Sequence, residues 1–404
     1  MIYIGINLYQ LQGATMDGTK FAKMLSDKHL FELDRMAYKY SAADVREFSE
    51  ILRQNFAQPL PLVDFAGQAL VCLPNLAQIS TKSMKQLLSV PAESQPFGVQ
   101  AMTEEIHATL QIENIHSTRN SIRHILNGNA PRNEEENRIY GMKRGLDFIA
   151  DQQNEITEKN LHQLYQISTG EYLPAEDKLL PDHFYRHDAV YIVGGEESRK
   201  GLSDELLPQV MKQLIDFANA EDDLNELHKA AILHFAFAYY HPYFDGNGRT
   251  ARLLHLWYLA RHGYPAALFT PFSRYIAERK TAYYKAYERV EKNAMLTGYT
   301  DVTPFMSYFC KEVYNRLQAD TAPAHTDFKV YQQALVEGRI TEKERLLWEY
   351  VLSAYGTSEF TTKQLEKDFR NAAYATIRTF VMKFNDMDLL AARNAGNRVF
   401  YKVK

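Results

Sequence analysis

One stretch of the sequence constrains the fold more than any other, because it predicts two helices joined by a tight loop. Residues 241–252 read HPYFDGNGRTAR, and the apolar segment LHKAAILHFAFAYY leads into them. Pro242 disfavours helical geometry at the residue before it, so the first helix is expected to end there. Gly246 and Gly248 permit backbone angles that other residues avoid, and a second helix is predicted to begin near Arg249. The stretch therefore predicts a helix, a glycine loop and a helix in close succession.

The loop also gathers residue types suited to a nucleoside polyphosphate. Backbone N–H groups of a glycine loop that enters a helix form a natural site for anions. Arg249 and Arg252 lie three residues apart, so they share a helix face, and their guanidinium groups can donate in pairs to phosphate. Asp245 offers a hard oxygen ligand for Mg2+, and His241 can act as a base near neutral pH. Singly these residues have ordinary structural explanations, but together they predict a site for phosphate and Mg2+.

This stretch resembles the signature of the Fic family, H-P-F-x-D/E-G-N-G-R-x-x-R, with Tyr243 in place of the usual phenylalanine. The resemblance implies a mainly α-helical fold, a Fic-type helical core with a β-hairpin flap, whose loop binds ATP and Mg2+. It implies that the protein moves AMP from ATP to a Ser, Thr or Tyr hydroxyl of a target protein, and automodification is also expected. Gly248 favours AMP transfer, because Doc-type kinases, which transfer the γ-phosphate, carry lysine there. The hydroxyl of Tyr243 would need a partner in the core.

The resemblance assigns a role to most residues of the loop. His241 would deprotonate the target hydroxyl, which would attack the α-phosphate and release pyrophosphate. Asp245 would hold Mg2+ between the α- and β-phosphates. The phosphates would be held by Gly246, Asn247, Gly248, Arg249 and Arg252. Charge stabilisation by donors placed in advance is usually the largest single contribution to catalysis.

A second motif precedes the loop in the same chain. Residues 109–114 read TLQIEN and resemble the inhibitory motif of the family, S/T-x-x-x-E-G/N. Thr109 and Glu113 are four residues apart and so lie on one face of a helix. The resemblance implies that Glu113 pairs with Arg252 and occupies the guanidinium meant for the γ-phosphate of ATP. Inhibition would then act in cis; the alternative is that Glu113 orients a water molecule for the removal of AMP.

Three further stretches resemble the family. Residues 184–195, FYRHDAVYIVGG, are the only strong strand signal before the C-terminus. They resemble the flap that docks target backbone by strand pairing, although an ordinary structural hairpin has the same pattern. Tyr283 and Tyr284 resemble residues near the nucleotide base, or they belong to the core. Residues 303–305 resemble the start of the last helix of the fold.

Length and composition limit the class of protein. The chain has 404 residues, of which 46% are hydrophobic and 24% charged, which is typical of a globular protein with two or three domains. A net charge of -4 argues against nucleic-acid binding through bulk charge. Two cysteines provide no disulfide framework. Because no secretory signal and no long apolar window is visible, we expect a cytoplasmic protein without a membrane span.

Apolar periodicity predicts that most of the chain is helical. The predicted helices span residues 42–55, 103–112, 134–150, 158–168, 206–220, 224–240, 249–262, 276–293 and 302–317. Residues 1–100 are otherwise expected to hold helices and irregular segments. The predicted domains are an N-terminal helical region (1–100), a Fic domain with its inhibitory helix (101–318), a linker (319–327) and a C-terminal domain (328–404).

The C-terminal domain resembles a small winged helix-turn-helix domain. Helices are predicted over residues 341–354, 362–369 and 372–384, followed by a hairpin over residues 390–404. The third helix and the hairpin contain six basic residues and two acidic ones, namely Arg378, Lys383, Arg393, Arg398, Lys402 and Lys404 against Asp386 and Asp388. This basic patch predicts contacts with the phosphates of DNA, but such domains also serve as protein-docking or homodimer modules.

Three functions therefore remain open from the sequence. The first is a protein adenylyltransferase that is inhibited in cis by Glu113. The second is a DNA-binding transcription regulator whose Fic body senses a nucleotide. The third is an enzyme that removes AMP or transfers another phosphate-linked group at the same site.

Overall fold

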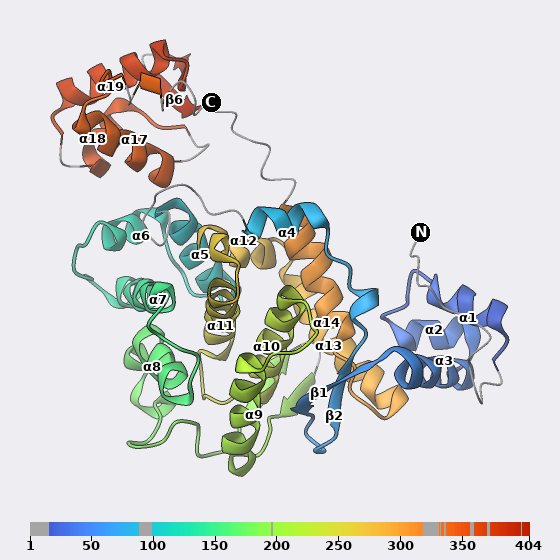
Figure 1. Cartoon of the computed structure of the whole chain (residues 1–404). Helices are drawn as coiled ribbons and strands as arrows, with labels where there is room; N and C mark the ends of the chain where they lie inside the picture. Colours follow the sequence, from blue (N-terminus) through green and yellow to red (C-terminus); the bar gives the residue numbers. More distant parts are fainter. Residues whose placement is uncertain are drawn as a thin grey trace.

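The computed structural model describes residues 16–88, 99–194, 197–317, 331, 333–334, 337–355, 359–369, 372–396 and 398–404. The chain is mainly helical, as predicted, with short two-stranded hairpins (Figure 1). The predicted linker over residues 319–327 lies outside the described residues. None of the described helices is both long enough and apolar enough to cross a membrane.

Three N-terminal helices form a small unit with a core of its own. They are α1 (Gly18–Leu25), α2 (Leu33–Tyr40) and the predicted α3 (Ala42–Phe56). Phe21 and Phe48 pack together in its core, with ring centroids 5.2 Å apart. The unit lies beside helix α13 (Lys280–Thr297), as Figure 1 shows. Helices α1 and α2 were not predicted, because each is only eight residues long.

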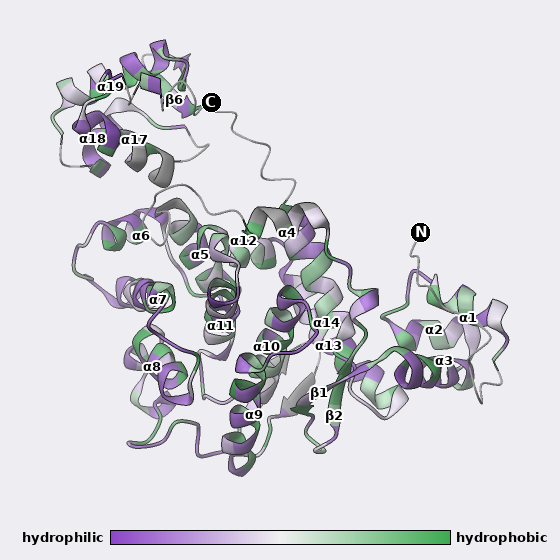
Figure 2. Ribbon diagram, in the orientation of Figure 1, coloured by the Kyte–Doolittle hydropathy of each residue, from purple (hydrophilic) through white to green (hydrophobic). Residues whose placement is uncertain are grey.

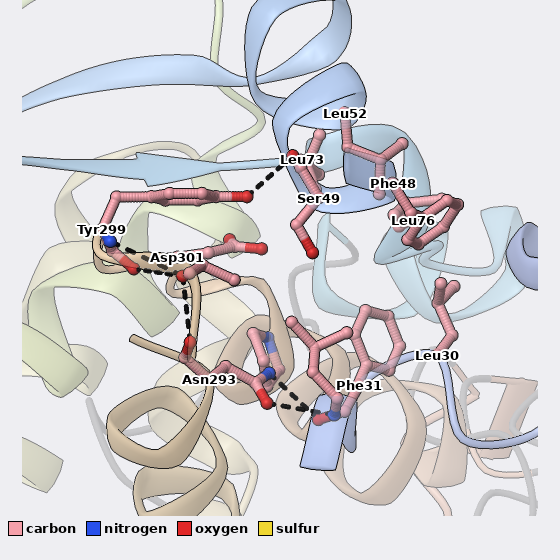
Figure 3. Close-up of a pocket in the computed structure, with 13 residues that line it drawn as sticks. Leu30, Phe31, Phe48, Ser49, Leu52, Leu73, Leu76, Asn293, Tyr299 and Asp301 are labelled. Atoms are coloured by element: carbon pink, nitrogen blue, oxygen red, sulfur yellow. Dashed lines mark hydrogen bonds between the residues drawn. The ribbon is translucent and has the colours of Figure 1, made fainter. Parts of the chain in front are cut away.

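Hydrogen bonds between side chains of the body and main-chain groups of this unit fasten the unit to the body of the protein. The Asn293 side chain accepts from the backbone N–H of Leu33 at 3.1 Å and donates to the carbonyl of Phe31 at 3.2 Å. The Tyr299 hydroxyl donates to the carbonyl of Ser49 at 2.9 Å. These bonds surround a small pocket lined by apolar residues of the unit (Figure 3). The buried Asn293 therefore holds the segment that leads into α2 by two bonds.

A β-hairpin follows the N-terminal helices, whereas only helices and irregular segments were expected there. Strand β1 (Gln58–Val63) pairs with β2 (Ala69–Cys72) in an antiparallel hairpin. The prolines of QPLPLV lower the strand signal, but they are tolerated because β1 is an edge strand. Strand β2 is hydrophobic along its length (Figure 2), and Val71 bonds the backbone of residues 300 and 302.

The central body consists of helices around α10 and α11. Its helices are α4 (Thr81–Leu88), α5 (Val99–Ile112), α6 (Arg119–Leu126), α7 (Glu134–Ala150), α8 (Glu158–Ser168), α9 (Leu207–Asn219), α10 (Glu226–Tyr240), α11 (Asn247–Arg261), α12 (Phe272–Glu278), α13 and α14 (Thr303–Tyr308). Helices α10 and α11 pack against each other and are buried on almost every side. The loop between them is thus held by the core of the molecule. Most of the predicted helices in this region are confirmed.

Three predictions for the body need correction. The helix predicted over 276–293 is two helices, because the backbone breaks at Arg279 between α12 and α13. The helix predicted over 302–317 is α14 followed by a π-helical turn (Phe309–Val313) and a 3-10 turn (Tyr314–Arg316). The strand or hairpin predicted over 184–195 is present as a hairpin, but it begins only at β3 (Tyr191–Gly194), which pairs with β4 (Glu197–Lys200).

The C-terminal region has the predicted order of elements. Helices α17 (Glu342–Ala354), α18 (Thr362–Phe369) and α19 (Tyr374–Asp386) precede strands β5 (Leu390–Ala395) and β6 (Arg398–Val403). These elements enclose a separate core around the fully buried Trp348. Helix α17 packs against α5 of the body (Figure 1). The interpretation as a winged helix stays a prediction.

The basic patch predicted for this region is smaller than the sequence indicates. Three of its six residues are paired within the C-terminal region: Lys383 with Glu344 at 2.8 Å, Arg393 with Glu359 at 2.6 Å, and Lys404 with Asp388. The acidic partners of Lys383 and Arg393 lie outside the segment from which the surplus was counted. Half of the predicted patch is therefore balanced inside the domain.

Candidate active site

The loop between α10 and α11 has the predicted course. Helix α10 ends at His241, which adopts the left-handed conformation with φ 53° and ψ 61°, an uncommon one for a residue other than glycine. Gly246, with φ 83°, caps the N-terminus of α11. A side chain at Gly246 would also collide with Thr169, whose Cγ2 lies 2.4 Å from the Cβ position. Both the backbone angle and the close contact therefore require glycine at this position.

The side chain of Asn247 braces this loop. Its Oδ1 accepts from the backbone N–H of Tyr243 at 2.9 Å, and its Nδ2 donates to the carbonyl of Tyr243 at 2.8 Å. Both polar ends of the amide are thus committed to the loop. The predicted part of Asn247 in holding phosphate stays a prediction, and only its main-chain N–H is placed for it.

Tyr243 fills the core beneath the loop, as expected for this position. Its ring stacks on that of Tyr165, with centroids 3.5 Å apart. Neither hydroxyl has a protein partner among the described residues, so the partner expected for Tyr243 is not found there. Burial is the main cause that raises the pKa of both phenols, which therefore stay neutral.

Asp245 and Arg249 form an ion pair at the start of α11. The Asp245 carboxylate is about half exposed and accepts from Arg249 Nη2 at 2.8 Å. Arg249 is buried, and its Nε has no protein partner among the described residues. The guanidinium therefore retains a donor for an anion, and Asp245 retains access to solvent and to a cation.

The predicted pair between Glu113 and Arg252 is present. Arg252 donates from Nη2 to Glu113 Oε1 at 2.6 Å and from Nε to Thr109 Oγ1 at 2.6 Å. Burial of the guanidinium opposes its charge, but the Glu113 carboxylate and the Tyr283 ring outweigh this effect and raise the pKa of Arg252. A Cβ atom at Gly248 would lie 2.4 Å from Glu113 Oε1. The carboxylate therefore lies against the first turn of α11, where a helix favours an anion.

Helices α12 and α13 hold α5 in place around this contact. Lys280 of α13 donates to the side chain of Asn114 at 2.7 Å, just beyond the end of α5. Nearer the start of α5, the buried Glu105 accepts from the backbone N–H of Ser273 at 2.9 Å and from its hydroxyl. Burial raises the pKa of Glu105. The sequence analysis missed Glu105, because an isolated glutamate on a helix gives no signal of a buried partner 168 residues away.

The two tyrosines proposed to lie near the nucleotide base differ. Tyr283 is buried, and its hydroxyl lies 2.8 Å from His234 Nε2 inside the core. Tyr284 is partly exposed and reaches the carbonyl of Ile112 at 3.5 Å. Tyr283 therefore belongs to the core that supports Arg252, whereas Tyr284 lies at the surface beside α5.

The hairpin predicted to be a flap is connected to the loop by Arg186, which the sequence does not mark as a functional residue. Arg186 is buried and donates from Nε to the carbonyl of His241 at 2.8 Å. Its backbone N–H donates to the carbonyl of Pro242 at 2.9 Å. Hairpin β3–β4 thus begins beside the loop, as predicted for a flap. The only signal in the sequence is an arginine just before a strand.

Comparison with known proteins identifies the domain that contains this site. Residues 155–259 match the family model for the Fic/DOC family. This segment is similar to Fic domains. The match includes the loop and most of α11 but not α5, so it does not cover the segment predicted to be inhibitory.

Relatives of the Fic domain have a named activity. A protein adenylyltransferase Fic from Drosophila willistoni is 33% identical over 140 residues, which cover 33% of this chain and 26% of that protein. A protein adenylyltransferase fic-1 from Caenorhabditis elegans is 26% identical over 217 residues, which cover 46% of this chain and 40% of that protein. The chain thus spans less than half the length of these curated relatives.

A solved structure shares the fold. The crystal structure of a Fic family protein from Desulfovibrio desulfuricans G20 has a TM-score of 0.51 with this chain at 17% identity. The match covers 81% of this chain and 97% of that one, so the likeness extends beyond the Fic domain to most of the molecule.

Proposed function

We propose that this Fic protein is an adenylyltransferase that moves AMP from ATP to a hydroxyl group of a protein, including its own chain. One observation carries the proposal. The loop brings His241, the N-terminus of α11 and the two buried arginines Arg249 and Arg252 together at a single site. Relatives of the Fic domain that are named protein adenylyltransferases support the same activity.

The reaction follows from the groups in the loop. The target oxygen forms a bond to the α-phosphorus of ATP, and the bond between that phosphorus and the oxygen of the leaving pyrophosphate breaks. His241 accepts the proton of the hydroxyl. The backbone N–H groups around Gly246 and Gly248, together with Arg249 and Arg252, stabilise the negative charge.

Asp245 would hold Mg2+ in this reaction. Its carboxylate is half exposed at the loop and already lies beside a buried guanidinium that can hold phosphate. No group of three or more histidine, cysteine or acidic side chains suited to a metal occurs in the described part of the chain. Mg2+ needs no such group, because it binds through one or two carboxylates together with substrate phosphates. When bound, Mg2+ would neutralise charge on the phosphates.

The enzyme is proposed to be inhibited in cis by Glu113. Its carboxylate binds Arg252 and lies against the first turn of α11, where a phosphate of ATP would otherwise lie. Thr109 contributes a second bond to the same guanidinium. Thr109 lies in the last turn of α5 and Glu113 in the turn that follows the helix, and both reach the same guanidinium. ATP would therefore bind in an unproductive position until α5 moves.

Transfer of radioactive label tests this proposal against the alternatives. In Glu113→Gly, label from α-32P-ATP should appear on the chain, whereas label from γ-32P-ATP should not. The added change His241→Ala should lower the rate by 10^2- to 10^4-fold, which is the usual contribution of a general base. Label from γ-32P-ATP alone would contradict AMP transfer.

Two further observations would support the other functions. A nucleotide that binds without any transfer, combined with loss of DNA binding on deletion of residues 328–404, would favour the transcription regulator. Loss of AMP from a labelled target that requires Glu113 would favour an enzyme that removes AMP. Three of the six basic residues form ion pairs within the C-terminal region, and this weakens the case for a DNA-binding regulator.

A further inference from the structure

Arg186 is a buried charge that the reaction above does not use. Its side chain is only 2% exposed, and it lies between α8 and hairpin β3–β4. Within the described part of the chain, every hydrogen bond of its guanidinium runs to a main-chain carbonyl, and none runs to a carboxylate. A buried arginine without an ion pair is costly, so its bonds to the backbone need an explanation.

The three carbonyls belong to three separate points of the chain. Nε donates to His241 at 2.8 Å, Nη1 donates to Asp188 at 2.7 Å, and Nη2 donates to Leu202. Asp188 precedes β3 and Leu202 follows β4, so these two carbonyls mark the two ends of the hairpin. The planar guanidinium thus joins both ends of the hairpin to the residue that carries the proposed base.

Gly201 and Val190 close the base of the hairpin beside the Arg186 guanidinium. The backbone N–H of Gly201 donates to the carbonyl of Val190 at 2.8 Å and closes the base of the hairpin. A Cβ atom at Gly201 would lie 2.7 Å from Val190 and 3.4 Å from Arg186 Nη2. Glycine at position 201 therefore lets the base of the hairpin close against Val190, with the Arg186 guanidinium in ordinary contact beside it.

We propose that Arg186 is a positioning residue that sets the target-docking hairpin relative to the imidazole of His241; this rests on the proposed function. A target segment that pairs with an edge of the hairpin takes its position from the hairpin. The imidazole takes its position from the backbone of His241, which is held in the left-handed conformation. Arg186 bonds both, so the distance between the target hydroxyl and the base depends on it.

Lysine cannot replace arginine in this role. An ammonium group is a compact point charge, whereas the guanidinium has donors in a fixed plane that point in different directions. Arg186→Lys therefore keeps the charge but loses part of the connection between the hairpin and His241. Arg186→Met loses both the charge and the connection.

The test compares these variants in the Glu113→Gly background, by initial rates of self-labelling from α-32P-ATP. Arg186→Met should lower the maximal rate by about 10^2-fold, since a misplacement of about 1 Å can have that effect. Arg186→Lys should lie between Arg186→Met and the parent. The ATP concentration at half-maximal rate should change by less than about 3-fold, because the arginines of the phosphate site are untouched.

Lys229→Met is the matched control. Lys229 is also a buried cation that donates to a main-chain carbonyl, that of Ala220, but it pairs with Asp222 at 2.7 Å as well, and it lies near the opposite end of α10. Twelve residues of helix place it about 18 Å from His241. A loss of rate in Lys229→Met as large as in Arg186→Met, at equal loss of thermal stability, would overturn the proposal. So would an unchanged rate in Arg186→Met.

Hydrogen exchange separates this inference from the proposed function. In Arg186→Met the amide of Gly201 should exchange at least about 10-fold faster, while amides of α11 keep their rates. If the Glu113→Gly parent transfers no label, the proposed activity fails, and the exchange result alone decides the role of Arg186. Unchanged exchange at Gly201 would contradict that role.

Discussion

The loop of the candidate active site and the end of α5, which is proposed to be inhibitory, meet at Arg252, but they are held in different ways. The loop is braced by contacts between near neighbours, such as Asn247 with Tyr243 and Arg249 with Asp245, each four residues apart. The inhibitory contact joins Arg252 to Glu113 across 139 residues and depends on few bonds. The loop is therefore a permanent part of the fold, whereas the inhibitory contact can be broken without unfolding the site.

The largest effect is expected from breaking the loop from within. Asn247→Ala removes both bonds to Tyr243, so it should lower self-labelling in the Glu113→Gly background by about 10^2-fold through misplacement of the loop. The matched control is Asn293→Ala, because Asn293 braces the N-terminal unit by the same kind of bonds. A rate for Asn247→Ala equal to that of the control would show that the brace is dispensable.

A smaller effect is expected from weakening the inhibitory contact without removing it. Thr109→Val deletes the hydroxyl that accepts from Arg252 Nε and keeps the shape of the side chain. A hydrogen bond to a charged group contributes about 1.5–3 kcal/mol, and the lower end of this range predicts that self-labelling rises by about 10-fold over the wild type. Within the Glu113→Gly background the same change should alter the rate by less than about 2-fold, since the inhibitory contact is already lost. An increase of similar size in both backgrounds would contradict the account.

Acid should destabilise the core around His255, a buried residue of α11. Burial lowers the pKa of His255 to about 3, so the folded chain keeps this residue neutral. The unfolded chain binds a proton below pH 6.5, and the stabilisation is therefore complete above that pH and declines as the pH falls toward 3. Between pH 6.5 and pH 5 the free energy of unfolding should fall by about 2 kcal/mol from His255 alone. Urea unfolding at both pH values measures this loss, and His255→Gln should reduce it; an equal loss in that variant would show that His255 is not responsible.

The smallest effect is expected at the base of the loop. The Tyr243 hydroxyl is buried without a protein partner among the described residues, so Tyr243→Phe should raise the free energy of unfolding by about 1 kcal/mol. Self-labelling should not change, because the ring still stacks on Tyr165. Thermal unfolding measures the gain. Destabilisation by Tyr243→Phe would mean that the hydroxyl is satisfied in solution.

The difference between local contacts in the loop and the long-range contact of Arg252 with Glu113 also explains what could be predicted from the sequence. The loop and its neighbouring helices were predicted closely, because Pro242, Gly246 and Gly248 act on the backbone at their own positions. The pair between Glu113 and Arg252 was predicted only through a family resemblance, since no local rule connects two residues so far apart.

Other features depend on distant partners and gave no usable signal. Arg186 was missed because one of its acceptors lies 55 residues away. Hairpin β1–β2 was missed because its prolines are acceptable only at the edge of a sheet, which the sequence does not show. The basic patch was overestimated because Glu344 and Glu359, which balance part of it, belong to other elements of the domain.

The most direct test of the central claim is the initial rate of self-labelling from α-32P-ATP in wild type, Glu113→Gly and Glu104→Gly. Glu104 lies within α5, the helix that leads to Glu113, and pairs with Arg119 at 3.0 Å, so its replacement introduces a glycine in this segment without freeing Arg252. We expect Glu113→Gly to raise the rate by at least about 10-fold, as loss of a buried charge-assisted bond implies. Glu104→Gly should stay near the wild-type rate. Equal activation by both changes would contradict the claim that Glu113 restrains the enzyme through Arg252.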